Sequence, residues 1–427
     1  HFLAHYLFIT LFDIGMQLKH TSFILCILLY IVSLFFYEYG KAWVSITMFG
    51  ILLTSFVQEP IQVHAQQFWT KKSLVLLTLS TFLLPLYLYN SIDLHYYYER
   101  VQIRAPFLAL PFAFASGMAI TRQVYLKLLS GFVLLAFLIA LVTFINYLSN
   151  IDIVNESYLR AKVMPSILNH VRLSIMLAMG SYLAYYLFRE NFKWCYNFER
   201  WFFLTIAVSL FVFVHLYSVR SGLIALYAAV FVEIGYYVYN SRNYKRTIGI
   251  LSVIILLVFL SVRFIPTLNN KWTNTLADIH VYQTNAYPNY NSLTTRFISY
   301  EGAIAIFKNA PLFGCGLGDI KTEMDSYFKA HYPMIDISIL PHNQFLFWLA
   351  ATGIVGLIFF SVTFFFPLFQ TRNWSNRVLI VHYTILFLSF QTEPMLETQL
   401  GVAYSLLFIL LPLTQEYKYK LTGSSAL

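Results

Sequence analysis

Long apolar runs follow one another along almost the whole chain, and they constrain its fold more than any other feature. A helix needs about 20 mostly apolar residues to span a membrane. The candidate spans cover residues 3–17, 21–38, 42–58, 73–89, 105–120, 124–148, 167–188, 201–217, 221–240, 247–265, 343–369, 377–392 and 399–415. Because several of these runs are short, we predict an all-α, polytopic integral membrane protein with 12 or 13 transmembrane helices.

Charge and cysteine usage agree with this fold class. Only 11% of the residues are charged, whereas soluble domains carry about 25%. The net charge of +9 is typical of Lys and Arg retained on the cytoplasmic side, so we expect no nucleic-acid partner. Cys26, Cys195 and Cys315 lie in unrelated segments without metal-ligand or redox spacing, and we expect neither a disulfide nor zinc.

The basic residues indicate the orientation and the domains. If the long segment 266–341 lies outside, the basic loops alternate to the cytoplasmic side, namely residues 71–72, 122–127, 189–200, 241–246, 371–377 and the tail after residue 415. This assignment gives N-terminal transmembrane helices over 1–265 and an outer loop domain over 266–341. It also gives C-terminal transmembrane helices with a cytoplasmic tail over 342–427.

The segment 266–341 is too long for a simple connector. A polar stretch over 267–292 precedes a helical pattern over 296–310, where apolar side chains recur at i, i+3 and i+4: Phe297, Tyr300, Ala303, Ile304 and Phe307. The "PLFGCGLGD" sequence of 311–319 ends that helix. We predict a small helical domain that caps a cavity on the outer face. The acidic residues in "GDIKTEMDSYF" indicate the start of an amphipathic helix rather than a metal site.

His342 and Asn343 stand at the start of an apolar helix, after Pro341. A histidine there is often an interfacial residue or a helix cap. A neutral imidazole can also accept a proton near neutral pH, as a general base must. Gly353 follows later in the same run and would let another helix approach closely.

Four arginines are predicted at the outer ends of helices: Arg172, Arg220, Arg263 and Arg296. Any one of them could extend to lipid phosphates at the membrane surface. Four on one side are better explained by a bound diphosphate, because guanidinium groups bind phosphate bidentately. Glu393 and Glu397 lie in an outer turn; they either pair with arginines or contribute to acceptor binding.

The combination of "RSGLIAL" (220–226), "TTRFISYEGAIAIFKNAPLFGCGLGD" (294–319) and "PHNQFLFWLAATGIVGL" (341–357) resembles the O-antigen ligase and polymerase superfamily. The histidine, ten residues and glycine from His342 to Gly353 are similar to the ligase signature. The likeness extends over about 165–365. Two positions depart from the pattern: Tyr300 replaces a leucine, and Val219 replaces a serine.

This resemblance implies a GT-C-type glycosyltransferase in the bacterial inner membrane, with its site facing the periplasm. It implies direct displacement with inversion, without metal or cofactor, from an undecaprenyl-diphosphate-linked glycan to an acceptor hydroxyl. His342 would be catalytic, and Arg172, Arg220 and Arg296 would bind the diphosphate. Arg263 matches no motif of the family.

Several functions remain open at this point. A ligase would transfer O-antigen to lipid A-core, a polymerase would extend the repeat unit on another lipid-linked chain, and a related ligase would glycosylate proteins. The ligase-like spacing favours the first. A transporter of lipid-linked glycan is a different class, but the sequence lacks repeated halves and charge pairs at mid-span. A purely structural protein would not explain the outer arginines.

Overall fold

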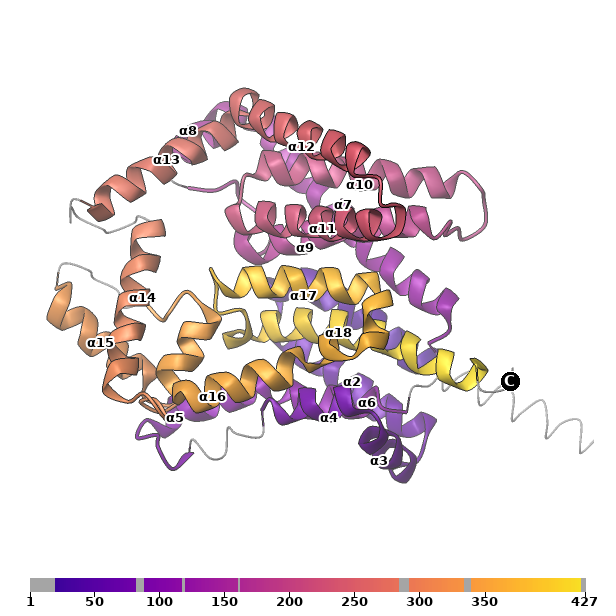
Figure 1. The fold of residues 1–427 in the computed structure, drawn as a ribbon, viewed down its shortest axis with the longest axis horizontal. Coiled ribbons are helices and arrows are strands. Elements are labelled where there is room, and N and C mark those ends of the chain that lie inside the picture. Colours follow the sequence, from indigo (N-terminus) through magenta and orange to yellow (C-terminus); the bar gives the residue numbers. More distant parts are fainter. Residues whose placement is uncertain are drawn as a thin grey trace, which may run out of the picture.

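The computed structural model describes residues 20–81, 88–116, 120–159, 162–283, 292–333 and 339–423. Within these ranges the chain is helical and contains no strand, as predicted. Figure 1 shows the long helices lying side by side, with α13, α14 and α15 gathered at one end of the bundle. We call this the loop end. The predicted span 3–17 lies outside the described residues.

The helices that precede the loop fall into two sets. The first set is the apolar helix His20–Phe35, η1 (Tyr37–Tyr39), α2 (Lys41–Gln58), α3 (Ile61–Thr70), α4 (Lys72–Leu79), α5 (Leu94–Arg104), α6 (Pro106–Ala113), α7 (Arg122–Ser149) and α8 (Ile151–Leu159). The second set is α9 (His170–Arg189), α10 (Glu199–Tyr217), α11 (Arg220–Ser241) and α12 (Tyr244–Phe264).

The loop and the C-terminal part supply the remaining elements. The loop contains α13 (Pro266–Gln283), α14 (Ser292–Asn309) and α15 (Ile320–His331). The C-terminal part contains α16 (Gln344–Phe369), η3 (Thr371–Ser375), α17 (Arg377–Phe390), η4 (Met395–Glu397) and α18 (Gln399–Gly423).

Among the described residues, seven helices are long and apolar enough to cross a membrane, namely α2, α7, α9, α10, α11, α12 and α16. The shorter apolar helices His20–Phe35, Arg377–Phe390 and Gln399–Gln415 coincide with three further predicted spans. Of the predicted spans 73–89 and 105–120, the described parts form the short helices α4 and α6. The all-α, multi-pass membrane class is confirmed, and the total of 12 or 13 spans stays a prediction.

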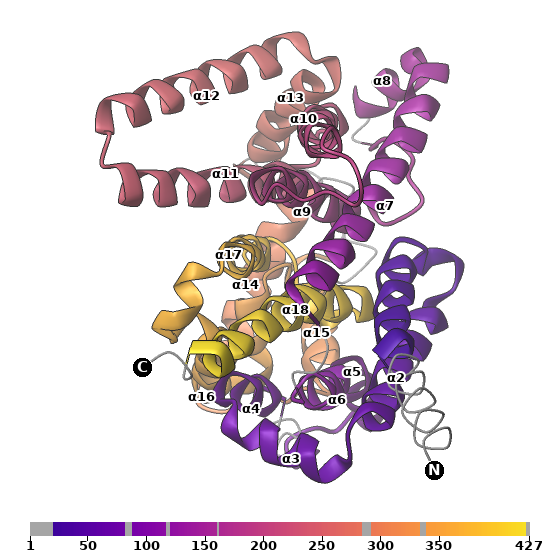
Figure 2. The ribbon, with the colours of Figure 1, turned by 90° about the vertical axis from the view of Figure 1, so that its right-hand side faces the viewer.

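Helix α9 lies at the centre of one half of the bundle, packed against α7, α10 and α11. Its predominantly apolar side chains are buried along almost its whole length. By contrast, α12 has few buried residues and stands apart from α11 in the view from the end opposite the loop (Figure 2). The bundle therefore has a tightly packed interior around α9 and one peripheral helix.

Three of the basic segments predicted to be cytoplasmic, 122–127, 189–200 and 371–377, carry ion pairs at the end of the bundle opposite the loop. Arg122 pairs with Glu190 at 2.5 Å, and both Arg189 and Arg377 pair with Glu233, at 2.7 and 2.8 Å. These contacts link α7 to the end of α9, and α9 and α17 to Glu233 of α11. The geometry thus separates the basic loops from the loop helices, as the charge pattern predicts.

Two details of the loop differ from the predictions. The polar stretch after residue 266 forms helix α13 up to Gln283. In α14 the buried apolar residues are Ile298, Ala303 and Ile306, whereas Ile304 is exposed. The predicted apolar face is therefore displaced around the helix, because α14 packs against α13, α15 and α16 rather than on a single surface.

Helix α16 is interrupted at Gly353, where φ is +67°. The 311–316 turn fills the gap and restores backbone hydrogen bonds: Cys315 N to Ala350 O (3.0 Å), Gly316 N to Ala351 O (3.0 Å), Ile354 N to Pro311 O (2.9 Å) and Val355 N to Leu312 O (3.3 Å). The prediction was that Gly353 allows another helix to approach closely. In the structure Gly353 is instead contacted by the 311–316 turn, whose backbone forms hydrogen bonds with the N–H and C=O groups that the break in α16 would leave unpaired.

Candidate active site

The starts of α9, α11 and α16 and the turn between α17 and α18 converge at the loop end (Figure 1). Asn169 caps α9, because its Oδ1 accepts a hydrogen bond from Val171 N (3.1 Å). Asn343 caps α16 in the same way, since its Oδ1 accepts from Phe345 N (2.9 Å). Asparagine is a preferred N-cap residue. The structure thus gives Asn343 a capping role.

Glu393 lies in the turn between α17 and α18 and joins two of the predicted site residues. Its Oε1 accepts a hydrogen bond from Arg296 Nη2 (2.5 Å), and its Oε2 lies 3.6 Å from His342 Nδ1. Burial favours a raised pKa, but the His342 ring and the positive charges of Arg296 and Arg172 outweigh it and lower the pKa of Glu393 to about 2. Glu393 is therefore a carboxylate at neutral pH.

The backbone of His342 is held by two neighbouring residues of α14. His342 N donates to Ser299 Oγ (3.2 Å), and Tyr300 Oη donates to His342 O (3.1 Å) and to Gln391 O (2.9 Å). Tyr300 is the residue that replaces the leucine of the resemblance. Its hydroxyl connects α14 by hydrogen bonds to the start of α16 and to the turn that carries Glu393.

A cavity of about 270 Å³ adjoins this group and is lined by basic residues from three elements. Arg220 comes from α11, Lys271 from α13 and Arg296 from α14, and His170 lines the cavity from α9. His342 is not a lining residue. Glu393 links His342 to the cavity, because its carboxylate faces the His342 ring and also binds Arg296, which lines the cavity.

Arg220 is only partly satisfied by protein groups. Its Nη2 donates to Thr275 Oγ1 (2.7 Å) and lies 3.5 Å from Asp278 Oδ2. Its Nε and Nη1 are buried and have no hydrogen-bond partner among the described residues. Because an unpaired buried donor is costly, these two groups favour a bound acceptor in the cavity.

Lys271 adds a titratable charge to the same cavity. Burial, followed by the repulsion of Arg220, lowers the pKa of Lys271 to about 8, against the opposing effect of Asp278. The lysine is mostly protonated at neutral pH and loses its charge in mildly alkaline solution. An anion in the cavity would favour the protonated form.

Close packing between α9 and α11 sets the position of Arg220. A Cβ atom on Gly222 would lie 2.5 Å from Ser174 Cβ, so only glycine permits this approach. The hydroxyls of Ser174 and Ser221 are 3.4 Å apart at the contact. The glycine of the "RSG" sequence therefore places Arg220 beside the start of α9, which carries His170 and Arg172.

A second cavity of about 250 Å³ shares Arg220 and Lys271 with the first. It lies between α11, α12 and α13, and its further lining includes Leu223, Val258 and Trp272. Arg220 and Lys271 thus stand between the cavity that also holds Arg296 and a second cavity whose lining is largely apolar. Such an arrangement suits a ligand with an anionic group and an apolar chain.

The remaining predicted residues are placed as follows. Arg172 is electrostatically coupled to Glu393, and its Nε donates to Thr398 Oγ1 at 3.3 Å. Arg263 is exposed in the last turn of α12 and does not line the cavity that holds Arg220 and Arg296. The structure therefore brings Arg172, Arg220 and Arg296 to one region and leaves Arg263 outside it.

Glu397 belongs to a separate buried network. It pairs with Arg104 of α5 and accepts a hydrogen bond from Gln344 Nε2 (2.8 Å), while Leu396 N donates to Gln344 Oε1 (2.7 Å). The Arg104 guanidinium also lies over the Trp348 ring, 4.6 Å from its centroid. Removing one partner of a buried ion pair is strongly destabilising, so this network secures the turn beside α16.

Lys271, His170 and Ser299 are site residues that no sequence motif indicates. Lys271 is one of several basic residues in a long polar segment, and Ser299 lies within the helical pattern over 296–310. His170 is the first residue of α9, the apolar helix that also carries Arg172, and its polar side chain at that helix start is the signal that the sequence offers. No spacing in the sequence shows that α13 folds back against α11.

The middle of the chain matches a known protein family. Residues 204–361 match the family model described as O-antigen ligase (Wzy_C). The matched segment runs from α10 into α16 and contains Arg220, Lys271, Arg296 and His342. No curated protein matches the chain. The match confirms the resemblance to the O-antigen ligase and polymerase superfamily, and the chain is therefore a multi-pass membrane protein in which residues 204–361 are similar to the O-antigen ligase family.

Proposed function

We propose that this protein is an O-antigen ligase in the inner membrane of a bacterium, with the loop end facing the periplasm. It takes a glycan from undecaprenyl diphosphate and joins it to a hydroxyl of lipid A-core. The family match supports a transferase of the ligase or polymerase type. The observation that carries the proposal is that two buried donors of Arg220 have no partner among the described residues, in a cavity that Lys271 and Arg296 also line.

The donor's diphosphate occupies the basic cavity. Arg220, Arg296 and Lys271 supply its hydrogen-bond donors, and the first turns of α9 and α11 border the same space. The positive ends of helix dipoles favour anions. The second cavity, beyond Arg220 and Lys271, receives the first part of the isoprenoid chain. The glycan then faces the open side, towards His342.

The reaction is a displacement at the anomeric carbon. A new bond forms between the acceptor oxygen and that carbon, and the bond from the carbon to the diphosphate breaks with inversion. The acceptor proton passes to His342 Nε2, because Nδ1 faces the Glu393 carboxylate and so carries the other proton. Glu393 stabilises the imidazolium that results. Arg220 and Arg296 stabilise the charge that develops on the leaving diphosphate more than that of the intact donor.

A polymerase and a protein O-glycosylating ligase would use the same residues in the same chemistry. The spacing from His342 to Gly353 favours the ligase. Both residues of this spacing are held by the loop. His342 is hydrogen-bonded to α14, and the break of α16 at Gly353 is filled by the 311–316 turn.

Deletion of the gene, followed by electrophoresis of lipopolysaccharide, tests the proposal. A ligase predicts core without O-chain together with accumulated long polymer on undecaprenyl diphosphate. Core that bears a single repeat unit would instead indicate a polymerase. Unchanged lipopolysaccharide with loss of glycan from proteins would indicate the protein ligase. Complementation with the wild-type gene and with His342→Ala separates loss of catalysis from loss of the protein.

A further inference from the structure

A further cavity of about 720 Å³, larger than the two beside Arg220, lies away from the candidate active site, between α9, α10 and α11. It is at the opposite end of the bundle, because Arg189, Ser241 and Arg377 stand at the far ends of α9, α11 and α17. Small-molecule sites typically measure about 300–1,000 Å³. The cavity is therefore large enough for a lipid chain.

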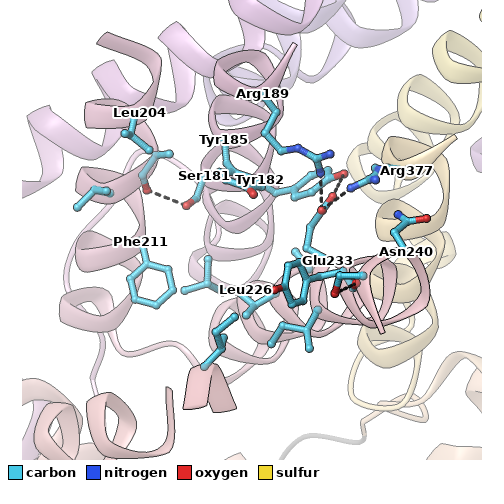
Figure 3. Close-up of a pocket in the computed structure, with 18 residues that line it drawn as sticks. Ser181, Tyr182, Tyr185, Arg189, Leu204, Phe211, Leu226, Glu233, Asn240 and Arg377 are labelled. Atoms are coloured by element: carbon cyan, nitrogen blue, oxygen red, sulfur yellow. Dashed lines mark hydrogen bonds and ion pairs between the residues drawn. The ribbon is translucent and has the colours of Figure 1, made fainter. Parts of the chain in front are cut away.

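The lining is apolar along its length and charged at one end. Ala207, Val208, Phe211 and Leu226 are among the apolar lining residues. Figure 3 shows Phe211 and Leu226 on one side, while Glu233 faces Arg189 and Arg377 on the other. This separation of an apolar chamber from a charged rim matches an amphipathic lipid.

The rim carries an excess of positive charge. Arg189 Nη1 and Arg377 Nη1 both donate to the same oxygen of Glu233, at 2.7 and 2.8 Å, and Tyr182 Oη donates to the other oxygen (3.2 Å). One carboxylate thus holds two guanidinium groups side by side. A guanidinium has five N–H donors, so each arginine keeps donors for a further anion. The side chain of Arg189 is 35% exposed.

We propose that this cavity binds one anionic phospholipid from the leaflet opposite the donor site. Its phosphate contacts Arg189 and Arg377, and one acyl chain fills the space between α9, α10 and α11. An anionic headgroup compensates the extra positive charge at the rim, which a zwitterionic lipid does only in part.

Native mass spectrometry of the purified full chain tests this site, with phosphatidylglycerol and phosphatidylethanolamine of matched acyl chains as probes. We expect one phosphatidylglycerol to be retained, with about tenfold preference over phosphatidylethanolamine, the scale of one charge-assisted hydrogen bond. Arg189→Gln should remove the preference and Arg189→Lys should keep part of it. Arg246 is exposed and lies outside the cavity, so the Arg246→Gln variant is the control and should retain both lipids as the wild type does.

One further variant and one soluble probe test whether the ligand is a complete phospholipid. Val208→Trp, at an exposed lining position of α10, should exclude the acyl chain and weaken retention of both lipids. Glycerol 3-phosphate, which has the phosphate but no chain, should not bind. Equal retention of the two phospholipids, an unchanged preference in Arg189→Gln, or tighter retention of undecaprenyl phosphate than of phosphatidylglycerol would overturn the proposal.

Discussion

His342 Nδ1 and Glu393 Oε2 face each other at 3.6 Å across the space between the start of α16 and the turn before α18. Glu393 is 7% exposed at its side chain and His342 is 31% exposed. The carboxylate is thus fixed in the protein, while the ring keeps one side towards the surroundings. The separation is longer than a hydrogen bond, so the contact is an electrostatic one. In the proposed reaction the carboxylate would stabilise the protonated ring, as the carboxylate of a hydrolytic triad does.

Replacement of His342 by alanine should abolish glycan transfer, because it removes the ring that is proposed to accept the proton of the acceptor hydroxyl. We expect a loss of at least about 10²–10⁴-fold, the usual contribution of a general base. Transfer is measured in vitro with purified donor and acceptor. His95→Ala, at a histidine whose side chain is 89% exposed, provides the matched control. Wild-type product levels from His342→Ala would rule out its catalytic role.

Replacement of Arg220 by alanine should lower transfer by about 10²–10³-fold, the cost of losing one preorganised donor in a transition state. Arg220→Lys should retain more activity, since it keeps the charge but not the bidentate geometry. Arg296→Ala and Arg296→Lys should follow the same order. Arg263→Ala is the comparison, because Arg263 is exposed outside the cavity. Equal activity of Arg220→Ala and Arg263→Ala would place the diphosphate elsewhere.

Glu393→Gln should reduce kcat and leave donor binding largely unchanged. The amide cannot stabilise the imidazolium of His342, although it can still accept a hydrogen bond from Arg296. Neutralising the orienting carboxylate of a triad lowers kcat by about 10⁴-fold, which sets the upper limit here. Glu393→Asp should recover part of the activity. A variant with unchanged kcat and a raised KM would mean that Glu393 serves the binding of substrate instead.

Diphosphate binding should weaken above about pH 8. The pKa of Lys271 in the free protein is lowered to about 8, so the lysine is charged below this pH and neutral above it. Affinity should therefore fall with rising pH, by at most about tenfold per unit for one proton. A diphosphate diester carries a constant charge over this range and is the appropriate probe. Lys271→Met should bind more weakly at pH 7 and show no such fall; a wild-type profile in this variant would contradict the assignment.

Gly353→Ala should destabilise the protein. The residue has φ of +67°, and an added Cβ would lie 2.3 Å from the carbonyl of Leu312. Backbone strain alone costs about 1–3 kcal/mol, and displacement of the 311–316 turn adds to it. Thermal unfolding in detergent measures the effect. Gly235→Ala, in α11 with open space around the added atom, should be neutral or slightly stabilising. Equal Tm values for the two variants would contradict a specific role of Gly353.

Hydropathy and charge spacing predict much of this architecture, because they report on local interactions with the membrane. The apolar runs give the helices that are long and apolar enough to span it, and the basic segments around Arg122, Arg189 and Arg377 lie at the end opposite α13–α15. The helix break in "PLFGCGLGD" is also predictable, since proline and glycine act on their own backbone. The face that α14 buries cannot be predicted in this way, because it depends on which helices pack around α14.

The sequence by itself determined that the chain is a bundle of membrane helices, and it supplied His342, Arg220 and Arg296 as candidates. Only the tertiary structure decided that Glu393 joins His342 to Arg296, that Lys271 shares the cavity, and that Arg263 does not. Contacts between residues far apart in the chain carry no local periodicity; they arise when close packing, such as that of Gly222 on Ser174, fixes how neighbouring helices meet.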